Sequence, residues 1–386
     1  MSSEVSHFSF PTTVIAGSGA LQELPPRLKY LNCQRPLVVT DPGLLETKAF
    51  QSLSRTLGEE KKGKTWHLFH GVHPNPVEKD VKEAAHTCRQ SKCDSVIAFG
   101  GGSALDVGKA CRLLIKRPQL SLARFNSDED WTGLPPCICI PTTAGTGSEV
   151  GRSSVITPEG KQRRSVVFHP NLLAALVILD AELTLDLPAL LTAATGMDAL
   201  THCIESFTSP VFHPFCEGIA LEGVHLIIEN LPRAYKEGRD QEARGKMLVA
   251  AAMGGVAFQK DLGATHSLAH PLSALHGMHH GTANAICLAH VMELNAKRKP
   301  GLYRRLGLAC GLDLFKLNDY GADAVTIDFI QRFIAALGLD QGLRAYGVEE
   351  SHIDALAEQA YQDTCHQTNP VPVTRKDLKA LYVAAL

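Results

Sequence analysis

The sequence predicts an α/β N-terminal domain with a parallel, Rossmann-like sheet, followed by an all-α C-terminal domain. From about residue 36, short β-rich runs alternate with helical segments, a pattern typical of a parallel sheet covered by helices on both faces. After residue 188, long helical patterns follow one another with almost no convincing strand between them. We therefore predict two domains, residues 1–184 and residues 185–386.

Short apolar runs predict the strands of the first domain, and amphipathic segments between them predict its helices. The predicted strands are residues 36–40, 66–69, 95–99, 137–140 and 175–179. The predicted helices are residues 43–57, 77–90 and 104–116.

The second domain is predicted to be built from long helices. They are residues 188–209, 215–237, 242–258, 282–297, 322–337 and 351–364. A last helix, residues 375–386, follows Thr374 and Asp377, which have the spacing of a capping box.

Composition excludes several classes of protein. Hydrophobic residues make up 45% of the chain and charged residues 20%, as in globular proteins. The net charge of −2 argues against nucleic acid as the main partner. We expect no signal peptide, and the longest aliphatic run, residues 172–179, is too short to cross a bilayer. Eleven cysteines without a Cys-x-x-Cys pair favour reduced thiols in a cytoplasmic protein without a membrane partner.

Two polar clusters in the second half have the spacing of metal ligands. Asp198 and His202 lie four residues apart, as do His266 and His270, and His280 follows. Residues four apart share one face of a helix. Two such residues can arise by chance in a chain with 17 histidines, but the second cluster lies among apolar residues, where unpaired polar groups are costly to bury. One carboxylate, from Asp198, and three imidazoles, from residues 202, 266 and 280, are ligands that suit Fe(II) or Zn(II). The sequence therefore predicts a catalytic metal site.

A glycine-rich turn in the first half suits a diphosphate. Gly101 and Gly102 follow a predicted strand and precede a helix, so the backbone could approach a phosphate held by the helix N-terminus. Ser103 is the predicted N-cap, with Asp106 three residues on, and we include both among the cofactor-binding residues. The turn lacks the G-x-G-x-x-G fingerprint, so a strand-to-helix turn without a ligand stays an alternative.

Two further loops favour a dinucleotide. Asp41 follows a predicted strand, where a carboxylate can accept from a ribose hydroxyl and would repel the phosphate of NADP. The alternative for Asp41 is a turn-forming residue before proline. The loop of residues 141–149 places Thr142, Thr143 and Ser148 among glycines, which supply donors without bulk.

Four motifs together resemble one known family. They are residues 100–106 (Gly-Gly-Gly-Ser-x-x-Asp), 141–149 (Pro-Thr-Thr-Ala-Gly-Thr-Gly-Ser-Glu), 195–202 (Thr-Gly-Met-Asp-Ala-Leu-Thr-His) and 266–281, the last followed by Ala-Asn-Ala. In this order they resemble the iron-containing (group III) alcohol dehydrogenase family, over nearly the whole chain. The resemblance implies a dinucleotide-binding first domain, NAD beside an iron ion with zinc as an alternative, and a homodimer.

The resemblance also implies roles for single residues. The implied metal ligands are Asp198, His202, His266 and His280, and His270 is implied to lie close to the substrate. The implied cofactor positions are Asp41, Asn75, Gly101, Gly102, Ser103, Thr142 and Thr143, with Arg164 near the nicotinamide ribose.

The chemistry implied is reversible hydride transfer between a primary alcohol or hydroxy acid, or its aldehyde, and NAD(H), with the metal polarising the substrate oxygen. His270 is our candidate for a proton relay, because imidazole titrates near neutral pH. Two alternatives stay open: a metal- and NAD-dependent lyase of the dehydroquinate-synthase type, and a non-catalytic NAD- or metal-binding protein. The sequence does not determine which alcohol or aldehyde is the substrate.

Overall fold

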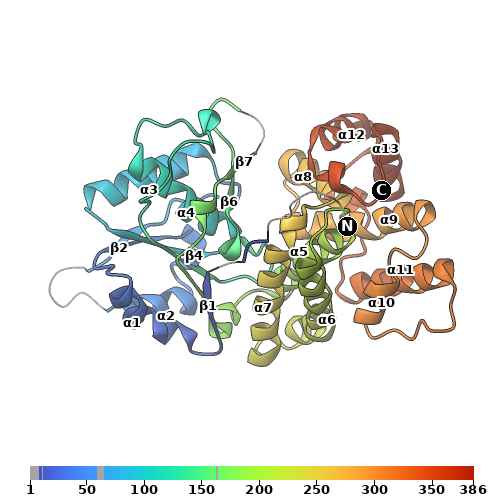
Figure 1. Ribbon diagram of the computed structural model, residues 1–386, viewed down its shortest axis with the longest axis horizontal. Helices are drawn as coiled ribbons and strands as arrows, with labels where there is room; N and C mark the ends of the chain where they lie inside the picture. Colours follow the sequence, from blue (N-terminus) through green and yellow to red (C-terminus); the bar gives the residue numbers. More distant parts are fainter. Residues whose placement is uncertain (1–7, 11, 59–64, 162–163) are drawn as a thin grey trace. The chain divides into compact units, whose positions relative to one another are not determined.

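A computed structural model describes residues 8–10, 12–58, 65–161 and 164–386 (Figure 1). These residues form two compact units. The first, the α/β unit, comprises the described residues of 10–187 together with residues 239–252. The second, the helical unit, comprises residues 188–238 and 253–386 together with residues 8 and 9. The boundary between residues 184 and 185 stays a prediction.

The α/β unit contains a six-stranded sheet in which every strand pair is parallel. Its order is β1-β8-β5-β4-β2-β3. The strands are β1 (Thr13–Ala16), β2 (Pro36–Val39), β3 (His67–Phe69), β4 (Ser95–Gly100), β5 (Cys137–Pro141) and β8 (Leu176–Leu179). Five of them match predicted strands to within one residue. The predicted parallel α/β fold is therefore confirmed, and β1 is the strand that the sequence patterns missed.

Helices cover both faces of this sheet (Figure 1). On one face, α1 (Leu24–Tyr30) and α2 (Lys48–Leu57) pack on alternate strand residues such as Ile97 and Phe99. On the other are α3 (Glu78–Gln90) and α4 (Gly102–Lys116). The predicted helix 43–57 was too long. Residues 42–44 form a 3₁₀ turn, and α2 begins only after Thr47, whose hydroxyl accepts from the backbone N–H of Phe50 at 3.2 Å.

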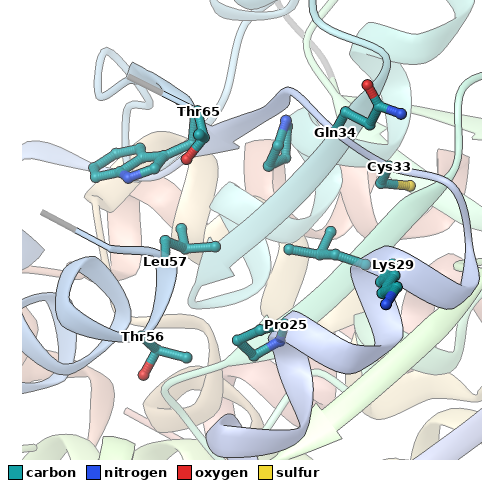
Figure 2. A pocket seen from close by; sticks show the side chains of 10 residues that line it. Pro25, Lys29, Cys33, Gln34, Thr56, Leu57 and Thr65 are labelled. Carbon is teal, nitrogen blue, oxygen red and sulfur yellow. The ribbon is translucent and has the colours of Figure 1, made fainter. Parts of the chain in front are cut away.

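A pocket of about 260 Å³ opens between α1 and α2 at the edge of this unit (Figure 2). Its lining includes Pro25 and Lys29 from α1, Leu57 from α2, and Cys33 and Gln34 from the loop that follows α1. None of the predicted metal or cofactor residues lines it. The pocket therefore adds nothing to the predicted site.

A two-stranded hairpin was also missed. Strands β6 (Ser153–Ile156) and β7 (Ser165–Phe168) pair antiparallel. Each has only two buried positions at most, so the apolar signal of this hairpin is weak. Strand β6 packs against α4, which carries residues of the glycine turn. The remaining short elements are the 3₁₀ helices Ala20–Glu23, Leu122–Arg124, Ser148–Val150, Pro170–Leu172 and Ala181–Thr184.

The helical unit contains no strand among its described residues, so the all-α prediction is confirmed. Its helices are α5 (Ala189–Thr208), α6 (Pro214–Lys236), α8 (Ala264–His276), α9 (His280–Arg298), α10 (Arg304–Ala309), α11 (Asp319–Ala336), α12 (Ile353–Gln362) and α13 (Arg375–Ala384), with the last residues of α7 (Gln241–Ala257). Its 3₁₀ helices are Phe258–Lys260, Leu343–Tyr346, Glu350–His352 and Cys365–Thr368. Within the described ranges, no helix has the length and apolar character that a membrane span requires.

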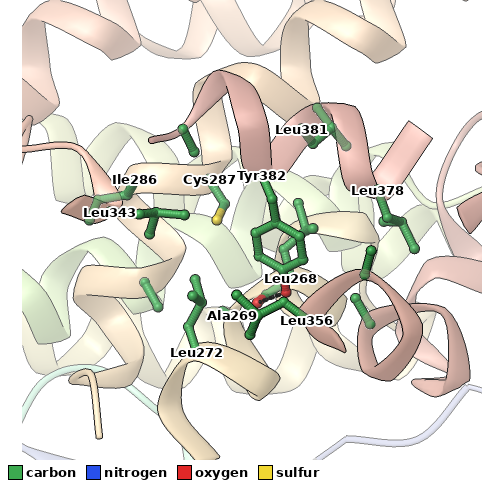
Figure 3. Packing of buried hydrophobic residues seen from close by; sticks show 14 of the residues in the cluster. Leu268, Ala269, Leu272, Ile286, Cys287, Leu343, Leu356, Leu378, Leu381 and Tyr382 are labelled. Carbon is green, nitrogen blue, oxygen red and sulfur yellow. Dashed lines mark hydrogen bonds between the residues drawn. The ribbon is translucent and has the colours of Figure 1, made fainter. Parts of the chain in front are cut away.

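One apolar core holds α8, α9, α12 and α13 together (Figure 3). Tyr382 of α13 lies in its centre and donates from its hydroxyl to the carbonyl of Leu268 at 2.7 Å. Helix α13 begins at the predicted capping box, in which the backbone N–H of Asp377 donates to the Thr374 hydroxyl at 3.2 Å. Because this core fixes α8 and α9, it also fixes the histidines that they carry.

Candidate metal centre and cofactor loops

Three helices bring the four predicted metal ligands together. Asp198 and His202 lie on α5, His266 lies on the first turn of α8, and His280 is the first residue of α9. The Nε2 atoms of His202, His266 and His280 lie 3.9, 3.8 and 3.4 Å from the same oxygen, Asp198 Oδ1. Helix α9 can approach α5 so closely because residue 281 is glycine: a Cβ there would overlap the carbonyl oxygen of Ala194.

These distances suit a small divalent ion. Four ligand atoms about 2.1 Å from a tetrahedral ion lie about 3.4 Å apart, and the separations from Asp198 Oδ1 begin at that value. The ligand atoms of Asp198, His202 and His266 all lie within 4.8 Å of one another. The predicted residues are therefore close enough to share one ion. Their role as ligands stays a prediction.

The polar atoms of the cluster also fit a cation. The amide nitrogen of Asn284 lies 2.8 Å from Asp198 Oδ1 and 3.3 Å from the Nε2 atoms of both His266 and His280. An amide nitrogen carries only two N–H groups, which is too few for three acceptors. In the part of the chain that the structure describes, Asn284 Oδ1 and His280 Nδ1 are buried without a hydrogen-bond partner. The cluster is therefore rich in acceptors and short of donors.

The pKa shifts of Asp198 and His280 also favour a bound cation, whereas that of His266 favours a proton. Burial would raise the pKa of Asp198, but the surrounding imidazoles lower it well below its usual value. Burial lowers the pKa of His280 well below the usual value, and Asp198 only partly opposes this. Burial also opposes a charge on His266, yet Asp198 and Glu205 raise the pKa of His266 to about 9. An ionised carboxylate and a neutral imidazole are the forms that bind metal ions. Asp198 and His280 are therefore in these forms without an ion, whereas an ion that binds His266 would have to displace a proton from it.

Glu205 is a functional candidate that the sequence patterns missed. It lies on α5, three residues after His202 and seven after Asp198, so helical spacing places it on the face that carries both. Its carboxylate is buried and lies 2.6 Å from Nδ1 of His266. The spacing alone could have indicated it.

His270 lies beside the cluster but has a different partner. Its ring stacks on that of His280, with centroids 5.3 Å apart. Its Nδ1 lies 2.8 Å from Asp363 Oδ2, a carboxylate 93 residues away in sequence that no sequence pattern indicated. The proton-relay role of His270 stays a prediction.

His270, Asp363 and Cys365 could by distance alone hold a second ion. However, Asp363 Oδ1 already accepts from the Ser267 hydroxyl at 3.0 Å and from the backbone N–H of Cys365 at 2.9 Å. Burial and the charge of Asp363 raise the pKa of the Cys365 thiol well above its usual value. A protonated thiol is a poor metal ligand. This group is therefore a hydrogen-bonded network that supports His270.

The predicted cofactor residues gather at one edge of the sheet in the α/β unit. Strands β5, β4 and β2 are neighbours, and the carboxyl ends of parallel strands meet at one edge, where such folds bind ligands. Asp41 follows β2, Gly101 and Gly102 follow β4, and Thr142 and Thr143 follow β5.

These loops touch one another at the glycines. A Cβ at Gly102 would lie 2.6 Å from the Thr146 side chain. A Cβ at Gly100, where φ is 143°, would lie 3.1 Å from the Leu44 side chain in the turn that follows β2. The turn after β4 therefore requires glycine for close approach of the flanking loops, with or without a ligand.

The structure corrects the predicted N-cap of α4. Ser103 is not the N-cap: α4 begins at Gly102 with Gly101 as its cap, and the Ser103 hydroxyl donates to the carbonyl of Pro74 at 2.7 Å. Serine propensity for caps misled the prediction, because the extended backbone before the helix ends at Gly101.

Other predicted cofactor residues form hydrogen bonds with each other. Asp106 Oδ1 accepts from the Ser148 hydroxyl at 2.5 Å, and its Oδ2 accepts from the backbone N–H of Val155 at 2.9 Å. The guanidinium of Arg164 donates to the side-chain oxygen of Asn75, and burial lowers the pKa of Arg164. Which of these residues touch a cofactor stays a prediction.

Comparisons with known proteins agree with this fold and cluster. Residues 11–181 match the family "Iron-containing alcohol dehydrogenase", and residues 192–386 match the "Fe-containing alcohol dehydrogenase family, C-terminal". A 4-hydroxybutyrate dehydrogenase of Cupriavidus necator is 37% identical over 94% of this chain and 95% of its own. An NAD-dependent methanol dehydrogenase of Bacillus methanolicus is 32% identical over 99% of this chain and 100% of its own. The crystal structure of a 1,3-propanediol oxidoreductase has a TM-score of 0.94 at 31% identity, covering 99% of this chain and 100% of that chain.

Fold, cluster and matches together define the class of the protein, which is an oxidoreductase. The chain belongs to the iron-containing alcohol dehydrogenase family, so the resemblance predicted from the four motifs is confirmed. The lyase and the non-catalytic binding protein are not favoured by any of these relatives.

Proposed function

We propose that this enzyme transfers hydride reversibly between a primary alcohol or hydroxy acid and NAD. The observation that carries the proposal is the convergence of three imidazole nitrogens on Asp198 Oδ1, in a chain of this family. Relatives that are named for methanol and for 4-hydroxybutyrate support small primary alcohols as the substrate class.

The proposed metal ligands are Asp198, His202, His266 and His280. Fe(II) is the ion that the family name favours, and Zn(II) is the alternative that the same ligands accept. A bound ion supplies Lewis acidity toward the substrate oxygen, and NAD supplies the carbon that accepts hydride. The helices hold the four side chains at their mutual distances, so little reorganisation is needed on binding.

The proposed NAD site lies at the carboxyl edge of the sheet. Asp41 follows β2, and we assign its carboxylate to a ribose hydroxyl, which favours NAD over NADP. The N-terminus of α4 offers backbone N–H groups to the diphosphate. The further residues that we assign to the cofactor are Asn75, Gly101, Gly102, Ser103, Asp106, Thr142, Thr143, Ser148 and Arg164.

His270 is the proposed acceptor of the substrate proton. Asp363 accepts from its Nδ1, which leaves Nε2 with a free lone pair in the neutral ring. We expect His270→Ala to lower turnover and to change its pH profile. Unchanged turnover and pH profile in this variant would remove His270 from the mechanism.

The test of the function is NADH formation with a panel of primary alcohols that includes 4-hydroxybutyrate. The protein is loaded anaerobically with Fe(II) or with Zn(II). We expect turnover in the loaded protein, its loss in Asp198→Ala, and no loss in Asp328→Ala, which removes an exposed carboxylate on α11. Binding of metal and NAD without turnover of any alcohol or aldehyde would contradict the proposal.

We also propose a cytoplasmic homodimer. All 11 cysteines are free thiols in the structure, which suits a reducing compartment. Cell fractionation and light scattering of the purified protein test the location and the dimer separately.

A further inference from the structure

Glu205 connects α5 to the first turn of α8. Its Oε2 accepts from the backbone N–H of Gly263 at 3.0 Å and lies 2.6 Å from Nδ1 of His266. Its Oε1 accepts from the backbone N–H of Thr265 at 2.7 Å. The residue is 5% exposed, so these three N–H groups, and not water, satisfy the carboxylate. Two of them belong to the N-terminus of α8, where a negative charge is favourable.

The contact with His266 decides which ring nitrogen keeps its hydrogen when the ring is neutral. An ionised carboxylate only accepts hydrogen bonds, so the hydrogen between Oε2 and Nδ1 belongs to His266. A neutral imidazole with its hydrogen on Nδ1 has a lone pair on Nε2. His266 Nε2 is the atom that faces Asp198 Oδ1, at 3.8 Å. The tautomer that Glu205 selects is therefore the one that can bind an ion at the cluster.

We propose that Glu205 is a positioning residue that keeps Nε2 of His266 available to the metal ion. The inference rests on the metal centre proposed above and adds a residue that binds no ion itself. Glu205 orients the ring, selects its tautomer and increases the basicity of Nε2 through the hydrogen bond to Nδ1. Because Asp198, His202 and Glu205 all lie on α5, one helix supplies two ligands and the support of a third.

The test replaces Glu205 with Leu, which fills a similar volume and accepts no hydrogen bond. Zn(II) affinity is measured by competition with a chelating indicator, and Co(II) absorbance reports the ligand geometry. We expect affinity to fall about 10–100-fold, the usual effect of losing such a partner. Glu205→Gln keeps an acceptor oxygen and should recover part of this loss, which also keeps the test valid if Glu205→Leu does not fold.

A matched control separates positioning from helix capping. Asn369 Oδ1 accepts from the backbone N–H of Ala264 at 3.2 Å, so it also caps α8 without touching His266. We expect Asn369→Ala to lower the Tm of the metal-free protein while Zn(II) affinity stays within about twofold of the original.

Two results would overturn the inference in distinguishable ways. If Glu205→Leu or Glu205→Gln lowers only the Tm and binds Zn(II) as tightly as the unchanged protein, Glu205 is a helix cap and nothing more. If the unchanged protein itself binds neither Zn(II) nor Co(II), the metal centre of the proposed function fails, and the inference fails with it.

Discussion

The amide of Asn284 donates to Asp198 Oδ1 at 2.8 Å, and the same oxygen faces three imidazole nitrogens. Asn284 therefore gives the buried carboxylate a hydrogen-bond donor when no metal ion is bound. A divalent ion at this oxygen would take over that role.

Asn284→Ala should destabilise the metal-free enzyme more than the metal-loaded one. Loss of a hydrogen bond to a buried charged group costs about 1.5–3 kcal/mol, and a bound ion would compensate for part of it. The measurement is the Tm with and without Zn(II): the rise on adding metal should be larger in the variant than in the unchanged protein. An equal loss of stability in both forms would show that Asn284 has no such role.

Asp261→Gly should stabilise the enzyme. Asp261 has φ 62° and ψ −175°, a region that is essentially restricted to glycine and costs other residues about 1–3 kcal/mol. Glycine adds entropy to the unfolded chain, so we expect a net gain of about 1 kcal/mol, measured as a higher free energy of unfolding in urea. Asp261→Ala is the control, because it removes the carboxylate but keeps Cβ. A gain of the same size in this variant would mean that charge, and not backbone strain, is responsible.

Lys109→Met should strongly destabilise the α/β unit. The ammonium group of Lys109 is fully buried, lies 3.4 Å from Asp106, and donates to the Ser148 hydroxyl at 2.7 Å and to the carbonyl of Ser153. Removing one partner of a buried ion pair costs about 3–5 kcal/mol. Urea unfolding provides the measurement. Lys79→Met, at an exposed ion pair with Glu83, should change stability by less than about 1 kcal/mol, and similar losses in both variants would contradict the role of Lys109.

Glu149→Gln should remove part of the dependence of stability on pH. Burial raises the pKa of Glu149 to about 7, against 4.5 as its ordinary value, although Lys109 opposes this. Because the folded state keeps the proton that the unfolded state releases, stability falls as pH rises from 4.5 to about 7 and is constant above that. The loss amounts to about 3 kcal/mol.

The measurement for Glu149 is the free energy of unfolding between pH 5 and 8. The variant should gain stability over the unchanged protein as pH rises across this interval. If the free energies of unfolding of the two proteins differ by the same amount at every pH from 5 to 8, the assigned pKa is contradicted, however large that difference is.

Much of the architecture followed from periodicity. A long helical pattern predicted the helix that carries Asp198 and His202, because helical spacing is a local property. Helix α8, which carries His266, was not among the predicted helices. Strand β1 and the hairpin of β6 and β7 were missed because their residues are largely exposed or only partly buried. Ser103 was assigned to the wrong cap position because cap propensity does not locate the end of the extended backbone.

The sequence by itself determined the parallel sheet, the all-helical second half and the spacing of the four predicted ligands, since each depends on residues close together in the chain. Only the tertiary structure decided which polar side chains meet. Glu205 reaches His266 across 61 residues, and Asp363 reaches His270 across 93. Such contacts depend on how helices pack, for example on the close approach of α9 to α5 at Gly281, and no local pattern of residue types encodes that distance.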